Sequence, residues 1–144
     1  DGRDARTERR VIAIDANVLI YAIENPLDPI GVAAQRVVAG PSIVGSTLLR
    51  VEVARGNHPH LNPATHALYE ATLANGNIDL IPVDLVLKEA ERIAGAYGFK
   101  AADAVHLATA VVGGATGFAT NDLALRRFPE LPILPATAWV TSVH

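Results

Sequence analysis

Hydrophobic and polar positions along the chain form short apolar runs separated by longer amphipathic stretches. The clearest run covers residues 11–14, four apolar residues that end at the polar residues Asp15 and Asn17. A continuous apolar run with a polar break is typical of a strand buried on both faces, as in a parallel sheet. Similar short runs predict further strands at 42–45, 78–83, 117–119 and 131–134.

Helical periodicity accounts for most of the chain between these strands. Gly40 is expected to close one helix, and Ser46 and Asp84 are each expected to cap the helix that follows. The predicted helices cover 16–24, 31–40, 47–56, 64–76, 85–98, 100–112 and 123–128. Strands alternating with helices predict an α/β fold, namely a three-layer α/β/α sandwich with a mostly parallel, about five-stranded sheet and a Rossmann-like topology.

Length and composition indicate one globular domain. The 144 residues, 50% hydrophobic and 19% charged, suit a single core. We expect one domain over 11–144, preceded by a charged, flexible tail over 1–10. No apolar run approaches the ~20 residues of a membrane-spanning helix. The chain has no Cys, which excludes disulfides and thiolate metal sites and fits a reducing, cytoplasmic location.

The charge balance leaves the partner open. The chain has 12 Lys and Arg against 15 Asp and Glu, for a formal net charge of −3. A protein that binds phosphate over a broad surface is usually basic. The chemical function must therefore be inferred from individual residues.

Four acidic residues stand in apolar or tightly turned surroundings. Asp15 and Asp122 each follow a predicted strand. Glu52 lies between two valines, and Asp103 lies in a helix that is apolar nearly all round. Taken singly, Asp15 and Asp122 have a simpler interpretation as helix caps, and Glu52 as a surface residue paired with Arg55. Taken together, they are predicted to converge, because the carboxyl ends of parallel strands share one edge of the sheet, where ligands bind.

Converging carboxylates have a definite chemistry. They repel one another unless cations neutralise them. An all-oxygen set without Cys, or His at ligand spacing, selects hard cations such as Mg²⁺ or Mn²⁺. Two such ions can activate a water and stabilise the leaving oxygen of a phosphodiester. The acidic residues therefore indicate metal-dependent phosphodiester hydrolysis.

These residues lie in motifs that resemble the PIN-domain ribonucleases, and most closely the VapC-type toxins of bacterial toxin–antitoxin pairs. The motifs, in chain order between residues 11 and 134, are IDANVLIY, STLLRVE, AADAVHLATA and GFATND. The resemblance implies an endoribonuclease that hydrolyses single-stranded RNA with one or two Mg²⁺ or Mn²⁺ ions. It also implies a homodimer, and an antitoxin partner that blocks the metal pocket.

The resemblance carries over residue by residue. Asp15, Glu52, Asp103 and Asp122 match the family's acidic quartet, which implies that they bind metal and act in catalysis. Ala16 stands where the family often has Thr or Ser, a change that removes a hydroxyl but no ligand. The residues that match pocket-supporting positions are Asn17, Ser46, Thr120 and Asn121. Our candidates for RNA contacts are Arg55, Arg126 and Arg127.

Other interpretations stay open. A non-catalytic PIN-like protein-interaction domain would keep the scaffold and only a structural metal. A HAD-type phosphohydrolase also places an aspartate after its first strand, but it needs a second one where Asn17 stands. His106 is within reach of substrate or metal, although a hydrogen-bonded core histidine is the simpler interpretation. Trp139 is expected to serve in packing or at an interface.

Overall fold

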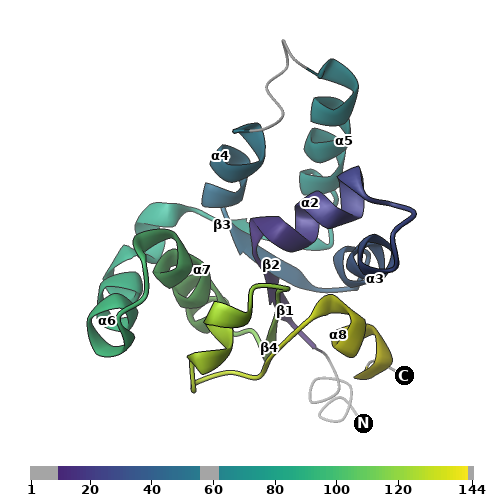
Figure 1. Ribbon diagram of the computed structural model, residues 1–144. Helices are drawn as coiled ribbons and strands as arrows, with labels where there is room; N and C mark the ends of the chain where they lie inside the picture. The colour runs from purple at the N-terminus through teal and green to yellow at the C-terminus, as the bar shows by residue number, and fades with distance from the viewer. Residues whose placement is uncertain (1–9, 56–61, 143–144) are drawn as a thin grey trace, which may run out of the picture.

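The structure is a computed structural model of the 144-residue chain and describes residues 10–55 and 62–142. The predicted tail over 1–10 lies almost wholly outside the described residues and stays a prediction. Strands and helices alternate along the described chain (Figure 1). In chain order the elements are β1 (Ile12–Ile14), α2 (Ala16–Glu24), α3 (Pro29–Val38), β2 (Ile43–Ser46), α4 (Leu48–Ala54), α5 (Pro63–Leu73), β3 (Ile78–Ile81), η1 (Val83–Leu85), α6 (Leu87–Tyr97), α7 (Ala101–Val112), β4 (Gly117–Ala119), η2 (Leu123–Arg127), β5 (Ile133–Leu134) and α8 (Ala136–Ser142).

The strands form one parallel sheet in the order β3-β2-β1-β4-β5. In the central strand, Ile12 lies opposite Ile43 of β2 on one side and opposite Gly117 of β4 on the other. The chain runs outward from β1 to β3 and then returns to the other side of β1 for β4 and β5. The carboxyl ends of β1 and β4 therefore flank the topological switch point, where open α/β sheets bind their ligands.

Helices cover both faces of the sheet, which confirms the predicted three-layer sandwich (Figure 1). Successive side chains of β1 point to opposite faces. Ile12 and Ile14 belong to the core beneath α2, α3 and α8, whereas Ala13 belongs to the core beneath α6 and α7. Burial on both faces explains the continuous apolar run of this strand. Among the described helices, none is both long and apolar enough to cross a membrane.

The predicted elements are confirmed except at some of their ends. Ser46 is the last residue of β2, and Thr47 takes the N-cap position of α4. The Ser46 hydroxyl nevertheless accepts a hydrogen bond from Leu48 N at 3.1 Å. The predicted cap at Asp84 is wrong. That residue lies inside the short 3₁₀ helix η1, and α6 begins at Leu87 without a side-chain cap.

Helix α8, of seven residues, was not predicted from the sequence. Trp139 anchors it to β4. The indole is 5% exposed and its Nε1 donates to Phe118 O at 2.8 Å. A Cβ at position 117 would lie only 2.2 Å from the ring, so Gly117 is what allows this close packing. Trp139 thus helps to fix the strand that ends at the switch point, which confirms its packing role.

Candidate active site

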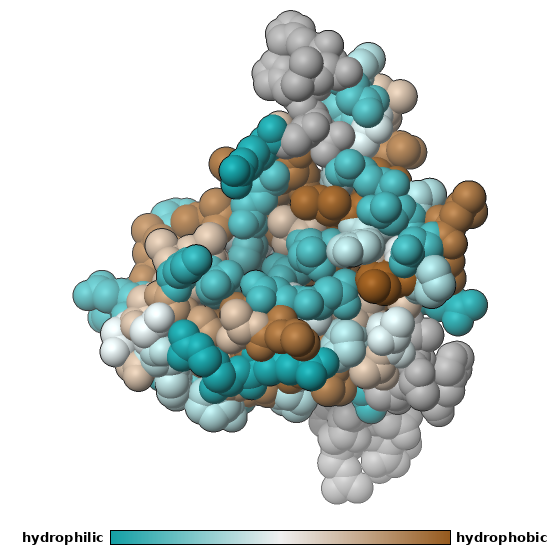
Figure 2. All heavy atoms as spheres, in the orientation of Figure 1, coloured by the Kyte–Doolittle hydropathy of each residue, from teal (hydrophilic) through white to brown (hydrophobic). Residues whose placement is uncertain are grey.

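A polar pocket of about 390 Å³ opens at the carboxyl ends of β1 and β4. Its lining residues come from α2, α4, α7 and the turn after β4, and Figure 1 shows how these elements are arranged around the end of the sheet. Figure 2, in the same orientation, shows hydrophilic residues gathered over the middle of this face. The lining residues are Asp15, Ala16, Asn17, Glu52, Asp103, His106, Asn121 and Asp122. The structure thus brings the four acidic side chains into one pocket.

Asp15 is the most firmly placed of these acids. It is the N-cap of α2, where its Oδ1 accepts a hydrogen bond from Val18 N at 3.3 Å. Its Oδ2 accepts a second hydrogen bond from the hydroxyl of Thr120 at 2.5 Å. The residue is 7% exposed, and this burial raises the pKa of the carboxyl although the Thr120 hydrogen bond acts in the opposite direction. The capping interpretation and the pocket interpretation are therefore both correct.

Thr120 joins the ends of β1 and β4. Its hydroxyl donates to Asp15 and accepts a hydrogen bond from Asp122 N at 3.0 Å. Asp122 in turn caps η2, because its Oδ1 accepts from Ala124 N at 3.0 Å. Thr120 is 2% exposed, so this link is shielded from solvent. The backbone after β4 is thereby fixed relative to Asp15.

Asp103 enters the pocket from the first turn of α7 and is partly buried. Burial raises the pKa of its carboxyl, and the negative charges of Asp122 and Glu52 raise it further. His106 and Lys100 lower that pKa, but by less than burial and the negative charges raise it. The acids are therefore close enough to feel one another's charge, and the chain supplies too little positive charge to balance them.

Glu52 is paired with a histidine rather than with the expected arginine. Its Oε1 lies 2.5 Å from His106 Nε2, and no pair with Arg55 occurs among the described residues. His106 is 3% exposed, which confirms a buried, hydrogen-bonded histidine. The contact between His106 and Glu52 was not predicted from the sequence. The sequence did carry one signal for this role. His106 follows Asp103 by three residues, which puts both side chains on the same face of α7.

Some polar atoms of the pocket residues have no hydrogen-bond partner. Within the described part of the chain, these buried atoms are Asn17 Oδ1, Asn121 Nδ2 and His106 Nδ1. Buried polar atoms are normally paired, so each unpaired atom calls for an explanation. Their gathering in one pocket favours a polar ligand there.

The donor set of the pocket fits a hard divalent cation. Four carboxylates line it, and none of the described lining residues is Lys or Arg. Oxygen donors of this kind suit Mg²⁺ or Mn²⁺. Across residues 10–55 and 62–142, no three His, Asp or Glu side chains lie close enough together to form a finished ligand shell. Like charges repel, and a divalent cation bound among these carboxylates would offset that repulsion.

The predicted supporting residues differ in their distance from the pocket. Asn17 and Asn121 line it, and Thr120 supports it through Asp15. Ser46 is fully buried at the end of β2 and is not part of the lining formed by the described residues. Its hydroxyl instead shapes the turn that leads into α4, the helix that carries Glu52.

The predicted RNA-contact arginines lie outside the described lining of the pocket. Arg55 and Arg126 are exposed. Arg127 has structural contacts, because its guanidinium donates to Tyr97 O and lies 3.8 Å from the centroid of the Phe99 ring. Arg127 therefore helps to pack η2 against the end of α6, and its contact with RNA stays a prediction.

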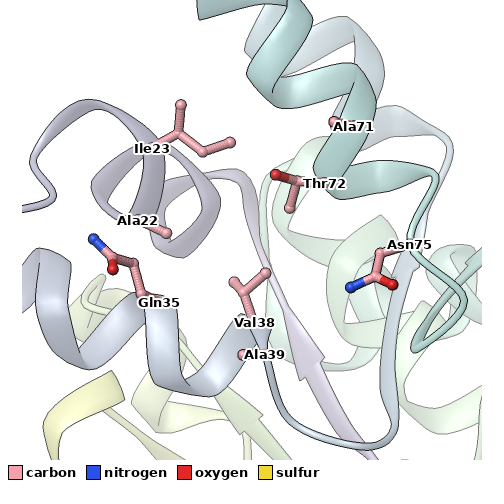
Figure 3. Close-up of a pocket in the computed structure, with 8 residues that line it drawn as sticks. All are labelled: Ala22, Ile23, Gln35, Val38, Ala39, Ala71, Thr72 and Asn75. Carbon is pink, nitrogen blue, oxygen red and sulfur yellow. The ribbon is translucent and has the colours of Figure 1, made fainter.

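A second cavity, of about 400 Å³, lies between α2, α3 and α5 and is called the helical groove below. Figure 3 shows that its lining residues come from these three helices and the chain just beyond α3 and α5. They are Ala22, Ile23, Gln35, Val38, Ala39, Ala71, Thr72 and Asn75, a set without an ionisable side chain. The helical groove and the acidic pocket are similar in volume but opposite in chemistry.

A family model of the PIN domain matches residues 12–131, a stretch that contains four strands of the sheet and all four pocket acids. The chain belongs to the PIN-domain family. This confirms the family suggested by the four motifs. No curated protein sequence matches the chain closely enough to add a relative.

Solved structures share the fold of this PIN domain at low sequence identity. A toxin–antitoxin complex from Klebsiella pneumoniae matches with a TM-score of 0.68 and 17% identity, over 87% of this chain and 97% of that one. VapC20 of Mycobacterium tuberculosis, a sarcin–ricin-loop-cleaving toxin, matches with a TM-score of 0.61 and 18% identity, over 84% of this chain and 98% of that one. VapBC-1 of nontypeable Haemophilus influenzae matches with a TM-score of 0.62 and 16% identity, over 88% of this chain and 98% of that one. The PIN domain therefore has the fold of VapC-type toxins.

Proposed function

We propose that this PIN domain is an endoribonuclease that uses Mg²⁺ or Mn²⁺ to hydrolyse phosphodiester bonds in single-stranded RNA. The observation that carries the proposal is the convergence of four carboxylates at the switch point of the sheet, with no Lys or Arg among the described lining residues. Divalent ions, when bound by such carboxylates, supply an activated water and stabilise charge on the leaving oxygen.

Each acidic residue has a role that follows from how it is held. Asp15 is the central ligand, because two hydrogen bonds fix its orientation and each carboxylate oxygen keeps a further lone pair for a cation. Asp103, Asp122 and Glu52 would complete the ligand set from α7, from the turn after β4 and from α4. Glu52 would also orient the attacking water. No residue of the pocket needs to act as a dedicated general base.

The size and surroundings of the pocket favour a flexible RNA strand. At about 390 Å³ the pocket is near the small end of ligand sites, which span ~300–1,000 Å³. A strand whose bases are not locked in a duplex enters such a site more easily. Arg55 and Arg126, which are exposed, are our candidates for contacts with phosphates beyond the pocket.

The direct test is cleavage of an unstructured RNA by the purified protein, with Asp15→Asn as the comparison. Asn caps helices as well as Asp does, so the variant should keep α2 intact. We expect cleavage with Mg²⁺ or Mn²⁺, none with EDTA, and a rate at least ~100-fold lower for Asp15→Asn. Failure of the folded native protein to cut RNA with either ion would favour the non-catalytic interaction domain.

We further propose that this PIN domain is the toxin of a toxin–antitoxin pair and works in the cytoplasm as a homodimer. Its fold is shared with the toxins and toxin–antitoxin complexes named above. The helical groove, with its mainly apolar walls, suits an amphipathic segment of an antitoxin. The absence of Cys fits the reducing interior in which RNA is made.

The partner proposals have separate tests. If a small gene for a DNA-binding protein lies immediately upstream, its product should co-purify with this PIN domain and inhibit cleavage. Ala71→Glu places a charge in the helical groove and should weaken that complex without lowering RNA cleavage. A monomeric mass at every concentration in size-exclusion chromatography with light scattering would contradict the homodimer.

A further inference from the structure

His106 connects two helices that carry pocket acids. It lies on α7, three residues after Asp103, and lines the pocket with 3% of its surface exposed. Its Nε2 is 2.5 Å from Oε1 of Glu52 on α4. The imidazole thus links the Glu52 carboxylate to the helix of another pocket acid.

Filling space in the core does not account for an imidazole at this position. The Nδ1 atom of His106 is buried and has no hydrogen-bond partner among the described residues. An unpaired buried nitrogen costs free energy that an apolar side chain of similar size would avoid. The contact between Nε2 and Glu52 is what such an apolar side chain would lack.

Glu52 receives little support from its own helix. α4 has seven residues, and its N-cap residue Thr47 makes no side-chain capping bond. The side chain of Glu52 is 30% exposed, so packing does not enclose it on all sides. A glutamate in this setting has several accessible rotamers unless a partner selects one of them.

We propose that His106 is a positioning residue that holds Glu52 ready for a divalent cation and thereby sets the affinity of the pocket for that cation. This inference rests on the proposed function. An ionised carboxylate only accepts hydrogen bonds, so Nε2 donates and Oε1 is occupied. Oε2 is the oxygen left for the cation or the attacking water. Removing a partner that orients a ligand typically lowers metal affinity by ~10–100-fold.

The test measures Mn²⁺ affinity by titration calorimetry on the full chain, separately from RNA cleavage. His106→Gln keeps an amide donor near the position of Nε2. His106→Asn carries its donor nearer the main chain, out of reach of Glu52. Thr109→Val is the matched control, because Thr109 is equally buried on α7 but bonds to Val105 O.

We expect His106→Asn to weaken Mn²⁺ binding about 10-fold or more, His106→Gln to recover most of that loss, and Thr109→Val to leave the affinity unchanged. In a Glu52→Ala background, His106→Asn should cause no further loss, because His106 acts through Glu52. Native-like affinity of His106→Asn, an equal loss in His106→Gln, or a further loss in the Glu52→Ala background would each overturn the proposal.

A second measurement does not depend on whether the His106 variants fold. The NMR spectrum of the native protein should contain a slowly exchanging His106 Nε2–H signal that disappears in Glu52→Ala. Absence of this signal, or its persistence in Glu52→Ala, would overturn the positioning role. A folded native protein that neither binds Mn²⁺ nor cuts RNA would instead overturn the proposed function, a result that these variants cannot imitate.

Discussion

Two groups of carboxylates in this PIN domain have opposite electrostatic surroundings. On α6, Arg92 pairs with Glu89 of the same helix at 2.5 Å and with Glu130, which precedes β5, at 2.6 Å. Tyr97 adds a hydrogen bond to Glu130. We call these four residues the Arg92 network. Hydrogen bonds from Arg92 and Tyr97 lower the pKa of Glu130.

In the acidic pocket the carboxyl pKa values are shifted upward instead. Burial raises the pKa of Asp15, and burial together with the charge of Asp122 raises the pKa of Asp103. The carboxylates of the Arg92 network therefore share a cation supplied by the chain, whereas the pocket leaves negative charge for a cation from outside. The difference teaches that a carboxylate's partners, rather than its presence, distinguish a structural ion pair from a candidate ligand.

The largest expected effect is on catalysis. Asp122→Asn should lower the rate of RNA cleavage by ~100-fold or more, because it removes a ligand charge from the pocket. Glu130→Gln removes the same charge from the Arg92 network and should leave the rate within about twofold of native, because exposed ion pairs contribute little. Initial rates on one RNA at saturating Mn²⁺ make the comparison. Similar losses in both variants would remove the distinction between the two groups.

The next effect is on stability in the presence of cation. Mg²⁺ at ten times its Kd should raise the free energy of unfolding by about 1.4 kcal/mol, because the ion binds only the folded pocket. Asp15→Asn should lose this gain and Glu130→Gln should keep it. Denaturant unfolding can be followed by the fluorescence of Trp139, the single tryptophan. Equal stabilisation of native protein and Asp15→Asn would place the ion elsewhere.

The smallest effect is on stability without cation, and its sign differs between the two groups. The raised pKa of Asp15 means that the ionised carboxyl opposes folding above that pKa. Asp15→Asn should therefore stabilise the metal-free protein at pH 8, on the order of 1 kcal/mol. The gain should shrink as the pH falls through the raised pKa, because native Asp15 then becomes neutral too.

Glu130→Gln should instead destabilise the protein slightly at neutral pH. The lowered pKa of Glu130 contributes stability that is present above its ordinary pKa and is lost as the pH falls through the lowered value. Unfolding midpoints of native, Asp15→Asn and Glu130→Gln protein between pH 8 and pH 4 test both signs together. Destabilisation by Asp15→Asn at pH 8 would show that its ionised carboxyl supports the fold.

The fold and the four acids could be predicted because their signals are local or topological. Burial of β1 on both faces requires a continuous apolar run, and that run is visible in the sequence. Asp15 and Asp122 each follow a strand of a parallel sheet, so the rule for strand ends brings them to the same edge.

The remaining features depend on contacts between distant parts of the chain. The partner of Glu52 is 54 positions away, and a nearer Arg55 appeared to be the simpler choice. The packing of Arg127 on Phe99 was not predicted, because only the folded chain brings that ring to it. The prediction of a helix cap at Asp84 was wrong for another reason. The 3₁₀ helix η1 precedes α6, so α6 begins only at Leu87.

The most direct test of the central claim is the anomalous scattering of Mn²⁺ in crystals of the native protein. We expect a strong peak in the acidic pocket, in direct contact with carboxylate oxygens of Asp15, Asp103 and Asp122, and no such peak in crystals of Asp15→Asn. A peak confined to the Arg92 network or to another surface, with none in the pocket, would contradict it.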